Sequence, residues 1–186
     1  MQAAAPLTDE NILALFADEK TKEQAFTALV QKYQRDIYNN VRRVVFLHDD
    51  AADVMQNVFV KIWRYLGDFR GDSSLKTWIA RICVNEALSF IKKKKELCNL
   101  NDDSYTNFML KTAADEKYFS SDKIESLVQH AIAILPEKQR VVFAYRYFDE
   151  MPYEEMSKIL DTSVGALKAS YHFAYQKVVE YIKKNS

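Results

Sequence analysis

Apolar side chains recur at spacings of three and four residues along almost the whole chain, and only three glycines and three prolines punctuate its 186 residues. This spacing places the apolar side chains on one face of an α-helix, whereas the alternation typical of a half-buried strand is hard to find. The length is sufficient for one domain or for two small ones. We therefore expect an all-α fold.

The first half of the chain is expected to form three helices. One helix, or a broken helix pair, is predicted over residues 21–47, and a second over 51–66 after a break at 48–50. The third helix begins near Thr77 and ends in the lysine run 92–95, where cations favour the negative end of the helix dipole.

The pattern changes after the lysine run, because Asn and Asp interrupt the apolar spacing over residues 96–121. Irregular segments of this length are uncommon inside one domain, so we expect a partly disordered linker at a domain boundary. Four helices are predicted beyond it, over 122–135, 136–148, 153–160 and from Val164 onward. A tight turn joins the last two helices, and Ser163 is placed to cap the final one. Together they form a helix-turn-helix pattern, whose second helix enters the major groove of DNA.

The formal net charge of zero conceals a segregation of charge along the chain. Residues 21–95 carry fourteen Lys and Arg against eight acids, whereas acids are in excess over 1–20 and 96–123. Residues 124–186 are balanced, with eight of each sign. A local basic excess of this kind is the electrostatic footprint of a nucleic-acid-binding segment.

The most informative stretch of the basic segment runs from Phe69 to Trp78, where two aromatics bracket a short polar turn. Aromatic faces beside cations can hold unstacked bases while the charges follow the phosphates. A helical wheel puts Trp78, Arg81 and Asn85 together on a face away from the apolar stripe. Trp78 is then a wedge or stacking platform, with Arg81 on phosphate and Asn85 at a base edge. Alternatively, Trp78 bends inward as a staple at the helix start.

Two further helix faces are candidate binding surfaces. The helix over 51–66 leaves a mixed stripe outward, formed by Asp53, Gln56, Asn57 and Val60, which either docks a partner helix or is an ordinary hydrated face. On the last helix, small residues would let the backbone approach a groove, while Lys168 and His172 could reach phosphates or base acceptors. Alternatively, these residues are ordinary exposed side chains that bind nothing.

Catalytic and membrane-spanning roles find no support in the sequence. The three histidines are scattered and no glycine loop could cradle a phosphate, so we expect no enzyme activity, no metal site and no cofactor. No run of about eighteen apolar residues exists, and the first residues lack the leader of a signal peptide, so we expect no membrane insertion. Cys83 and Cys98 are expected to be free thiols of a reducing cytoplasm.

Residues 49–59 (DDAADVMQNVF) and 69–82 (FRGDSSLKTWIARI) resemble the second conserved domain of sigma-70 family factors. Residues 135–140 (LPEKQR), 153–156 (YEEM) and 163–168 (SVGALK) resemble the fourth. The absence of the intervening third domain is the mark of the extracytoplasmic-function group of that family. The resemblance covers about residues 20–95 and 122–184, and two ordered motif blocks make it specific.

The resemblance implies a dissociable promoter-specificity subunit of bacterial RNA polymerase, built from two small helical domains. The expected divisions are an N-terminal extension at 1–20, a region 2 helical bundle at 21–95, a flexible linker at 96–121 and a region 4 helix-turn-helix domain at 122–186. The linker would thread the RNA-exit region of core RNA polymerase. An anti-sigma factor would cover both domains until a signal releases the chain, which is expected in the cytoplasm or held at the inner membrane by a membrane anti-sigma factor.

The resemblance also implies roles for individual residues. Contacts to the clamp coiled coil of core polymerase are expected from Asp53, Gln56, Asn57 and Val60. Contacts to the non-template strand of the −10 element, including a flipped base, are expected from Phe69, Arg70, Ser73, Lys76, Trp78, Arg81 and Asn85. Contacts to duplex −35 DNA are expected from Ser163, Ala166, Lys168, Ala169, Ser170 and His172.

The chain departs from the family pattern at three of its positions. Asn57 replaces a common acidic residue, which leaves one polymerase contact open. Ser170 and Phe173 stand where many members carry Arg, so fewer phosphates would be held by the last helix. Two other functions stay open from the sequence. One is a helix-turn-helix regulator that binds duplex DNA without polymerase, and the other is a protein-interaction bundle, which predicts no salt-dependent DNA affinity.

Overall fold

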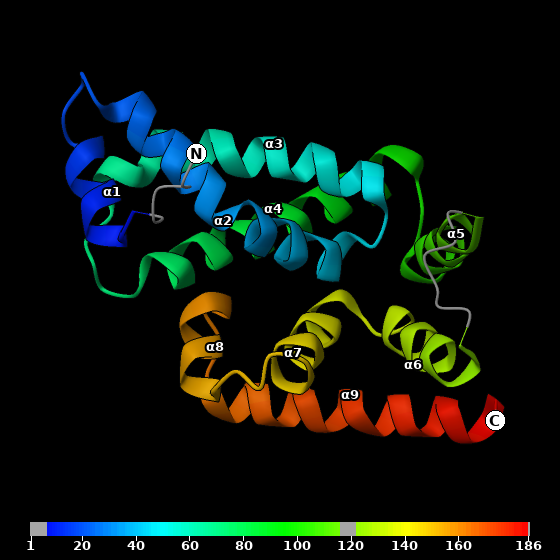
Figure 1. The fold of residues 1–186 in the computed structure, drawn as a ribbon. Coiled ribbons are helices and arrows are strands. Elements are labelled where there is room, and N and C mark those ends of the chain that lie inside the picture. The colour runs from blue at the N-terminus through cyan, green and yellow to red at the C-terminus, as the bar shows by residue number, and fades with distance from the viewer. Residues whose placement is uncertain (1–6, 116–121, 186) are drawn as a thin grey trace.

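The computed structural model describes residues 7–115 and 122–185, and these residues form helices with no strand among them, which confirms the all-α prediction. The helices lie in two layers, with α1 to α4 in one layer, α6 to α9 in the other, and α5 to one side (Figure 1). We call residues 7–98 the first unit and residues 122–185 the second unit. Within the described residues, no helix is long and apolar enough to cross a membrane.

The first unit is a bundle built around the long helices α2 (Lys22–Val45) and α4 (Leu75–Cys98), with α3 (His48–Tyr65) packed against both. Its core consists of the apolar stripes that the spacing predicts, including Leu29, Ile37, Val58, Ile62 and Ile79. A short 3-10 turn, η1 (Leu66–Asp68), follows α3. The helix predicted over 21–47 is therefore one unbroken helix.

A helix that the sequence did not predict, α1 (Asp9–Phe16), begins the described chain. Its N-cap is Thr8, whose hydroxyl accepts a hydrogen bond from the Asn11 amide at 3.3 Å. Lys32 and Tyr33 of α2 both donate to the Asp9 carboxylate, each at 2.7 Å. The expected N-terminal extension thus carries a helix packed on the bundle, while residues 1–6 lie outside the described residues.

Two helix starts in the first unit differ from the predicted positions. Residues 48–50, expected to be a break, form the first turn of α3, where the carboxylates of Asp49 and Asp50 favour the positive end of the dipole. The break lies instead at Phe46, which has a positive φ of 65°. Helix α4 begins at Leu75 because the Ser74 hydroxyl caps it, accepting from the Thr77 amide at 3.1 Å.

Part of the segment expected to be an irregular linker, residues 96–121, is helical. Helix α4 extends to Cys98, and α5 (Asp102–Asp115) follows after a short turn. Asn101 caps α5 by accepting from the Ser104 amide at 2.8 Å, so this polar residue begins a helix rather than interrupting one. Tyr105 and Met109, one helical turn apart, are buried. The last part of the expected linker, residues 116–121, lies outside the described residues.

The second unit contains the four predicted helices, and their bounds agree with the prediction to within a few residues. They are α6 (Lys123–Ala133), α7 (Glu137–Tyr147), α8 (Tyr153–Leu160) and α9 (Val164–Asn185). Asp122 caps α6 through the Ile124 and Glu125 amides. Helix α9 runs along the full length of its layer to the C-terminus (Figure 1).

The two units share their hydrophobic core. The cluster built from α2, α3 and α4 continues into the second unit through Val142, Tyr145, Ile159 and Leu167. A second cluster lies around Phe143 and the inner faces of α6 and α9. Within the described residues, the units are therefore packed on one another across α2, α4, α7 and α8.

Candidate nucleic-acid interface

Two features shape the turn between η1 and α4. Gly71, with a φ of 78°, supplies the left-handed conformation that the turn requires. The Ser74 hydroxyl caps α4 and lies 2.8 Å from the Thr77 hydroxyl. Arg70 and Lys76 are exposed and Ser73 is half-buried, so the turn presents cations and hydroxyls to the surroundings. This arrangement suits a phosphate-bearing strand.

Trp78 packs against Phe69, the other aromatic of this stretch. Their ring centroids are 5.7 Å apart and the rings meet edge to face at 62°. Both side chains are half-buried against the first unit's core. This contact is the one that the inward reading of Trp78 predicts, and the half-buried ring keeps part of its surface accessible.

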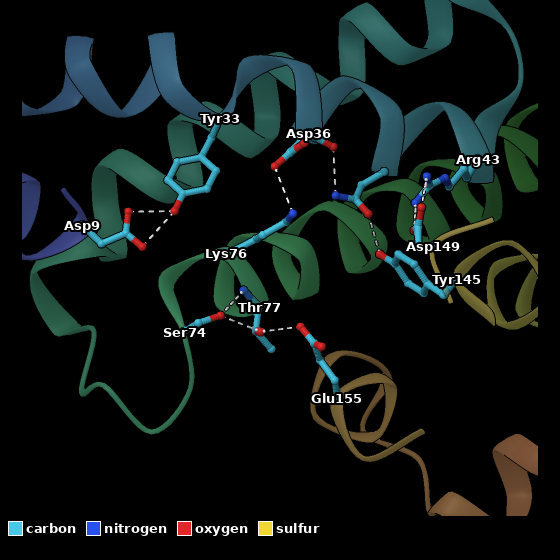
Figure 2. A network of polar contacts seen from close by, with 11 residues as sticks. Asp9, Tyr33, Asp36, Arg43, Ser74, Lys76, Thr77, Tyr145, Asp149 and Glu155 are labelled. Carbon is cyan, nitrogen blue, oxygen red and sulfur yellow. Dashed lines mark hydrogen bonds and ion pairs between the residues drawn. The ribbon is translucent and has the colours of Figure 1, made fainter. Parts of the chain in front are cut away.

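The face of α4 beyond Trp78 points toward the second unit. The Arg81 guanidinium donates to the Lys158 carbonyl of α8, with Nε at 2.7 Å. The Thr77 hydroxyl donates to Glu155 of α8 at 3.3 Å (Figure 2). Asn85 lines a cavity of about 270 Å³ whose other wall includes Ala166 and Ser170 of α9. The residues expected on −10 DNA thus lie partly on the open turn and partly on a face of α4 that borders the second unit, where Arg81 and Asn85 remain exposed.

The outward stripe of α3 is fully accessible. Asp53, Gln56, Asn57 and Val60 are all exposed, and Val60, an apolar side chain, retains 55% of its surface. The first three line a groove of about 770 Å³ that α3 forms with the C-terminal half of α4. An exposed apolar residue within a polar rim is the usual anatomy of a protein-binding surface.

Five of the six residues predicted to contact −35 DNA are exposed at or near the start of α9, and Ser170 is half-buried. Ser163 caps the helix by accepting from the Ala166 amide at 3.3 Å. Lys168, Ala169 and His172 are exposed together with it. Ala166 and Ser170 lie toward the cavity shared with α4. The predicted inward side of α9 is confirmed, because Leu167, Ala174 and Val178 are buried and Tyr171 is half-buried.

Two residues beside this face were missed by the sequence reading. The Tyr153 ring lies below the Lys168 ammonium at 5.8 Å and the Arg146 guanidinium at 5.2 Å. Arg146 also donates to the Glu150 carbonyl at 3.2 Å. Three helices therefore meet at one tyrosine ring, which holds two cations at the edge of the helix-turn-helix. Helical spacing could not reveal this grouping, because each residue lies on a different helix.

The two cysteines are free thiols in different surroundings. Burial raises the pKa of the Cys83 thiol to about 12, so the group stays protonated at neutral pH. Cys98 is exposed on the last turn of α4. Among residues 7–115 and 122–185, no group of three or more His, Cys, Asp or Glu is placed to hold a metal ion.

Comparison with known proteins gives matches for both units. Residues 29–96 match the family model for sigma-70 region 2, and residues 125–178 match the one for sigma-70 region 4. The ECF RNA polymerase sigma-E factor of Escherichia coli K12 is 31% identical over 159 residues, covering 81% of this chain and 83% of that protein. The RNA polymerase sigma-H factor of Pseudomonas aeruginosa is 30% identical over 167 residues, with coverages of 81% and 82%.

Solved structures with the same fold cover nearly the whole chain. CnrH, in complex with the cytosolic domain of CnrY, superposes with a TM-score of 0.65 at 20% identity, covering 96% of this chain and 99% of that one. The sigma factor RpoE of Bartonella quintana, in complex with the anti-sigma factor NepR, gives a TM-score of 0.62 at 19% identity, with coverages of 85% and 96%.

Proposed function

This chain belongs to the extracytoplasmic-function group of the sigma-70 family, and we propose how its surfaces direct promoter-specific initiation as an alternative sigma factor. The observation that carries the proposal is the presence of both DNA-reading units in family order on one chain. Region 2 and region 4 match separate parts of the sequence, and each part presents an open face of matching chemistry. A regulator that binds duplex DNA alone would have no use for the turn at 69–78.

The exposed stripe of α3 is the proposed docking surface for core RNA polymerase. Val60 supplies an apolar contact, while Asp53 and Gln56 supply polar contacts at its rim. Asn57 offers an amide in place of a carboxylate, so this position contributes a neutral hydrogen bond. The groove between α3 and α4 gives a partner helix a place to lie along this face.

The turn at 69–78 is the proposed binding site for the non-template strand of the −10 element. Arg70 and Lys76 would contact phosphates on either side of the turn, and Ser73 would hydrogen-bond within it. Phe69 and Trp78 fix the turn, so that a flipped base meets a preorganised surface. Arg81 and Asn85, which are both exposed, would extend the site along α4.

Helix α9 is the proposed reader of duplex −35 DNA. Lys168 and His172 are exposed near its start, and the small side chain of Ala169 between them allows close approach to a groove. Arg146 adds a cation beside Lys168, because both side chains lie over the Tyr153 ring. Ser163 presents the helix N-terminus, which favours a phosphate.

We further propose that the chain works in the cytoplasm with an anti-sigma partner. RpoE is found with the anti-sigma factor NepR, and CnrH with the cytosolic domain of CnrY, which supports the proposal for this chain. The chain itself would carry out no bond chemistry, which is left to the polymerase. The division into a region 2 domain at 21–95, a linker at 96–121 and a region 4 domain at 122–186 is part of this proposal.

Transcription from fragmented genomic DNA of the source organism tests the function. Purified core polymerase with this chain should initiate at a limited set of sites that share a −10 and a −35 motif. Core polymerase alone is the first control, and the second is Asp53→Arg, which should lose polymerase binding in gel filtration while keeping its helical content. Initiation no greater than with core polymerase alone, on every fragment, would refute the proposal.

A further inference from the structure

One stripe on the outward face of α9 carries no charge, although this helix is the proposed reader of duplex DNA. Four exposed residues follow one another there at spacings of three and four: Ala166, Ala169, Phe173 and Gln176. At about 100° per residue, they lie within an arc of about 80° on the helix surface. We call these four residues the neutral stripe. Its composition is unusual for a DNA-binding face, because contacts to phosphates require cations.

Phe173 is the largest side chain of the neutral stripe, and 56% of its surface is exposed. The His172 ring meets it edge to face, with ring centroids 6.0 Å apart and an interplanar angle of 64°. His172 is itself exposed, so this contact supports the phenyl ring without burying it. An aromatic ring that stays this accessible gains free energy when an apolar group covers it.

The residues that precede Phe173 on the neutral stripe allow the ring to approach a groove. Ala166 and Ala169 have short side chains, so the first two turns of α9 present little beyond the backbone on this side. The Ser163 hydroxyl caps the helix by accepting from the Ala166 amide at 3.3 Å. Figure 1 shows α9 along the side of the second unit that is farther from α2 and α3. Phe173 is therefore the most prominent side chain of the stripe.

Two cations lie to one side of the neutral stripe instead of on it. Lys168 is about 140° around α9 from Phe173, and its ammonium lies 5.8 Å from the centroid of the Tyr153 ring. The Arg146 guanidinium lies over the same ring at 5.2 Å. These cations can hold phosphates at the edge of a groove, which leaves the stripe to face the base pairs.

The chemistry of the neutral stripe favours A·T base pairs. Thymine is the only base that presents a methyl group in the major groove, and a phenyl ring gains by covering it. Over a G·C pair the same ring would leave hydrogen-bonding groups of the bases without partners. Arg and Lys, the side chains that bind guanine, are absent from the stripe, whereas the amide of Gln176 suits adenine.

We propose that Phe173 is a specificity-determining residue of α9, which reads thymine methyl groups in the major groove of the −35 element. Phe173 stands where many members of the family carry Arg. An arginine there could bind guanine through two hydrogen bonds, so the ring changes the base that this position prefers. The inference deepens the proposed function, and it rests on the assignment of α9 to duplex DNA.

Selection from random duplexes tests which bases the chain prefers. The full chain, alone and with core RNA polymerase, is mixed with a pool of random duplexes, and the bound sequences are read. The wild-type chain should enrich thymine at one or two fixed positions, and Phe173→Arg should enrich guanine at the same positions. Because Phe173 is exposed, the substitution should leave the helical content unchanged in circular dichroism. Enrichment of the same bases by both chains would overturn the inference.

Deoxyuridine isolates the methyl group, because it differs from thymidine only in lacking that group. Replacing the enriched thymidines one at a time should weaken wild-type binding by about fourfold at the position under the ring, the effect of one buried methyl-sized group. Phe173→Ala should bind more weakly and show no such loss.

The matched control for Phe173→Ala is Tyr175→Ala. Tyr175 is similarly exposed, at 48% against 56%, but it lies about 160° around α9 from Phe173. Its ring faces Tyr171, with centroids 6.2 Å apart. Tyr175→Ala should therefore keep the fourfold response to deoxyuridine. Wild-type binding that is unchanged by every deoxyuridine, or the same loss in Phe173→Ala, would overturn the inference.

The outcomes separate failure of this inference from failure of the proposed function. If the chain initiates at no promoter but enriches duplexes through Phe173, the sigma-factor proposal fails and the assignment of Phe173 stands. If promoters are found and thymine methyl groups make no difference, Phe173 reads no base and the sigma-factor function stands. If no duplex is enriched with or without polymerase, both proposals fail.

Discussion

Trp78 contributes to the interface as a brace for its neighbours. Its ring packs edge to face on Phe69, and both rings lie against the first unit's core. An indole exposed to solvent would be free to stack on a base, whereas this one is already in contact with protein. We therefore predict that Trp78 contributes to DNA binding by bracing the turn between the two rings.

Replacing Trp78 should distinguish bracing of the turn from direct contact with DNA. Trp78→Ala should impair promoter opening and lower the free energy of unfolding by about 2 kcal/mol, because a half-buried aromatic contact is lost. Trp78→Phe should keep most of both, since a ring still reaches Phe69. Permanganate reactivity of promoter thymines measures opening. An equal loss of promoter opening in the two variants would show that the indole itself touches DNA.

Lys168 and Lys177 offer a matched comparison on a single helix. Lys168 lies on the open face of α9, whereas Lys177 hydrogen-bonds to Gln139 at 3.1 Å. Lys168→Ala should weaken binding to −35 duplex and reduce the salt dependence of the affinity by about one phosphate contact. Lys177→Ala should change neither. The same salt slope for both variants would contradict the assignment of the α9 face.

At the scale of elements, the spacing did not reveal α1 and α5, whereas it indicated the other α-helices. Helix α1 buries Ile12 and Phe16, and α5 buries Tyr105 and Met109. Two apolar residues one turn apart give too little periodicity to distinguish a helix from a loop. Helix α8 also buries only two residues, but Pro152 before it and the turn at 161–163 after it mark its ends. Asn101 does not identify the start of α5, because the same residue type favours both caps and loops.

The candidate surfaces were predictable only as helix faces. Spacing correctly put Arg81 and Asn85 on one side of α4, but nothing in the spacing says that α8 and α9 lie opposite them. Likewise, Arg140 belongs to a recognisable motif, whereas its bond to the Val44 carbonyl depends on how the units pack. Contacts between distant segments are set by tertiary structure, which local pattern does not contain.

The cap of α4 is the element feature on which the turn depends. Ser74→Ala removes the acceptor of the Thr77 amide and should lower the free energy of unfolding by about 1 kcal/mol. Ser89→Ala, an exposed substitution within the same helix, should stay within about 0.5 kcal/mol of wild type. Urea unfolding followed by circular dichroism measures both. Equal midpoints for the two variants would mean that the cap contributes nothing.

At the scale of the whole molecule, the two units pack against each other through a shared hydrophobic core. The core that begins between α2 and α4 continues through Tyr145 and Ile159, so each unit completes the other's packing. The apolar area buried between the two units stabilises their packing beyond what the polar contacts between them provide. The two units are therefore joined by apolar packing as well as by polar contacts.

The shared core also limits how the chain can be recombined with its relatives. Val142 and Leu167 of the second unit lie in the same cluster as Val84 of α4, so a substitution on one side changes the fit on the other. A chimaera that joins this first unit to the second unit of a relative would inherit both sets of DNA contacts. The apolar side chains between its two units, however, would not fit one another. Such hybrids should therefore be less stable than either parent.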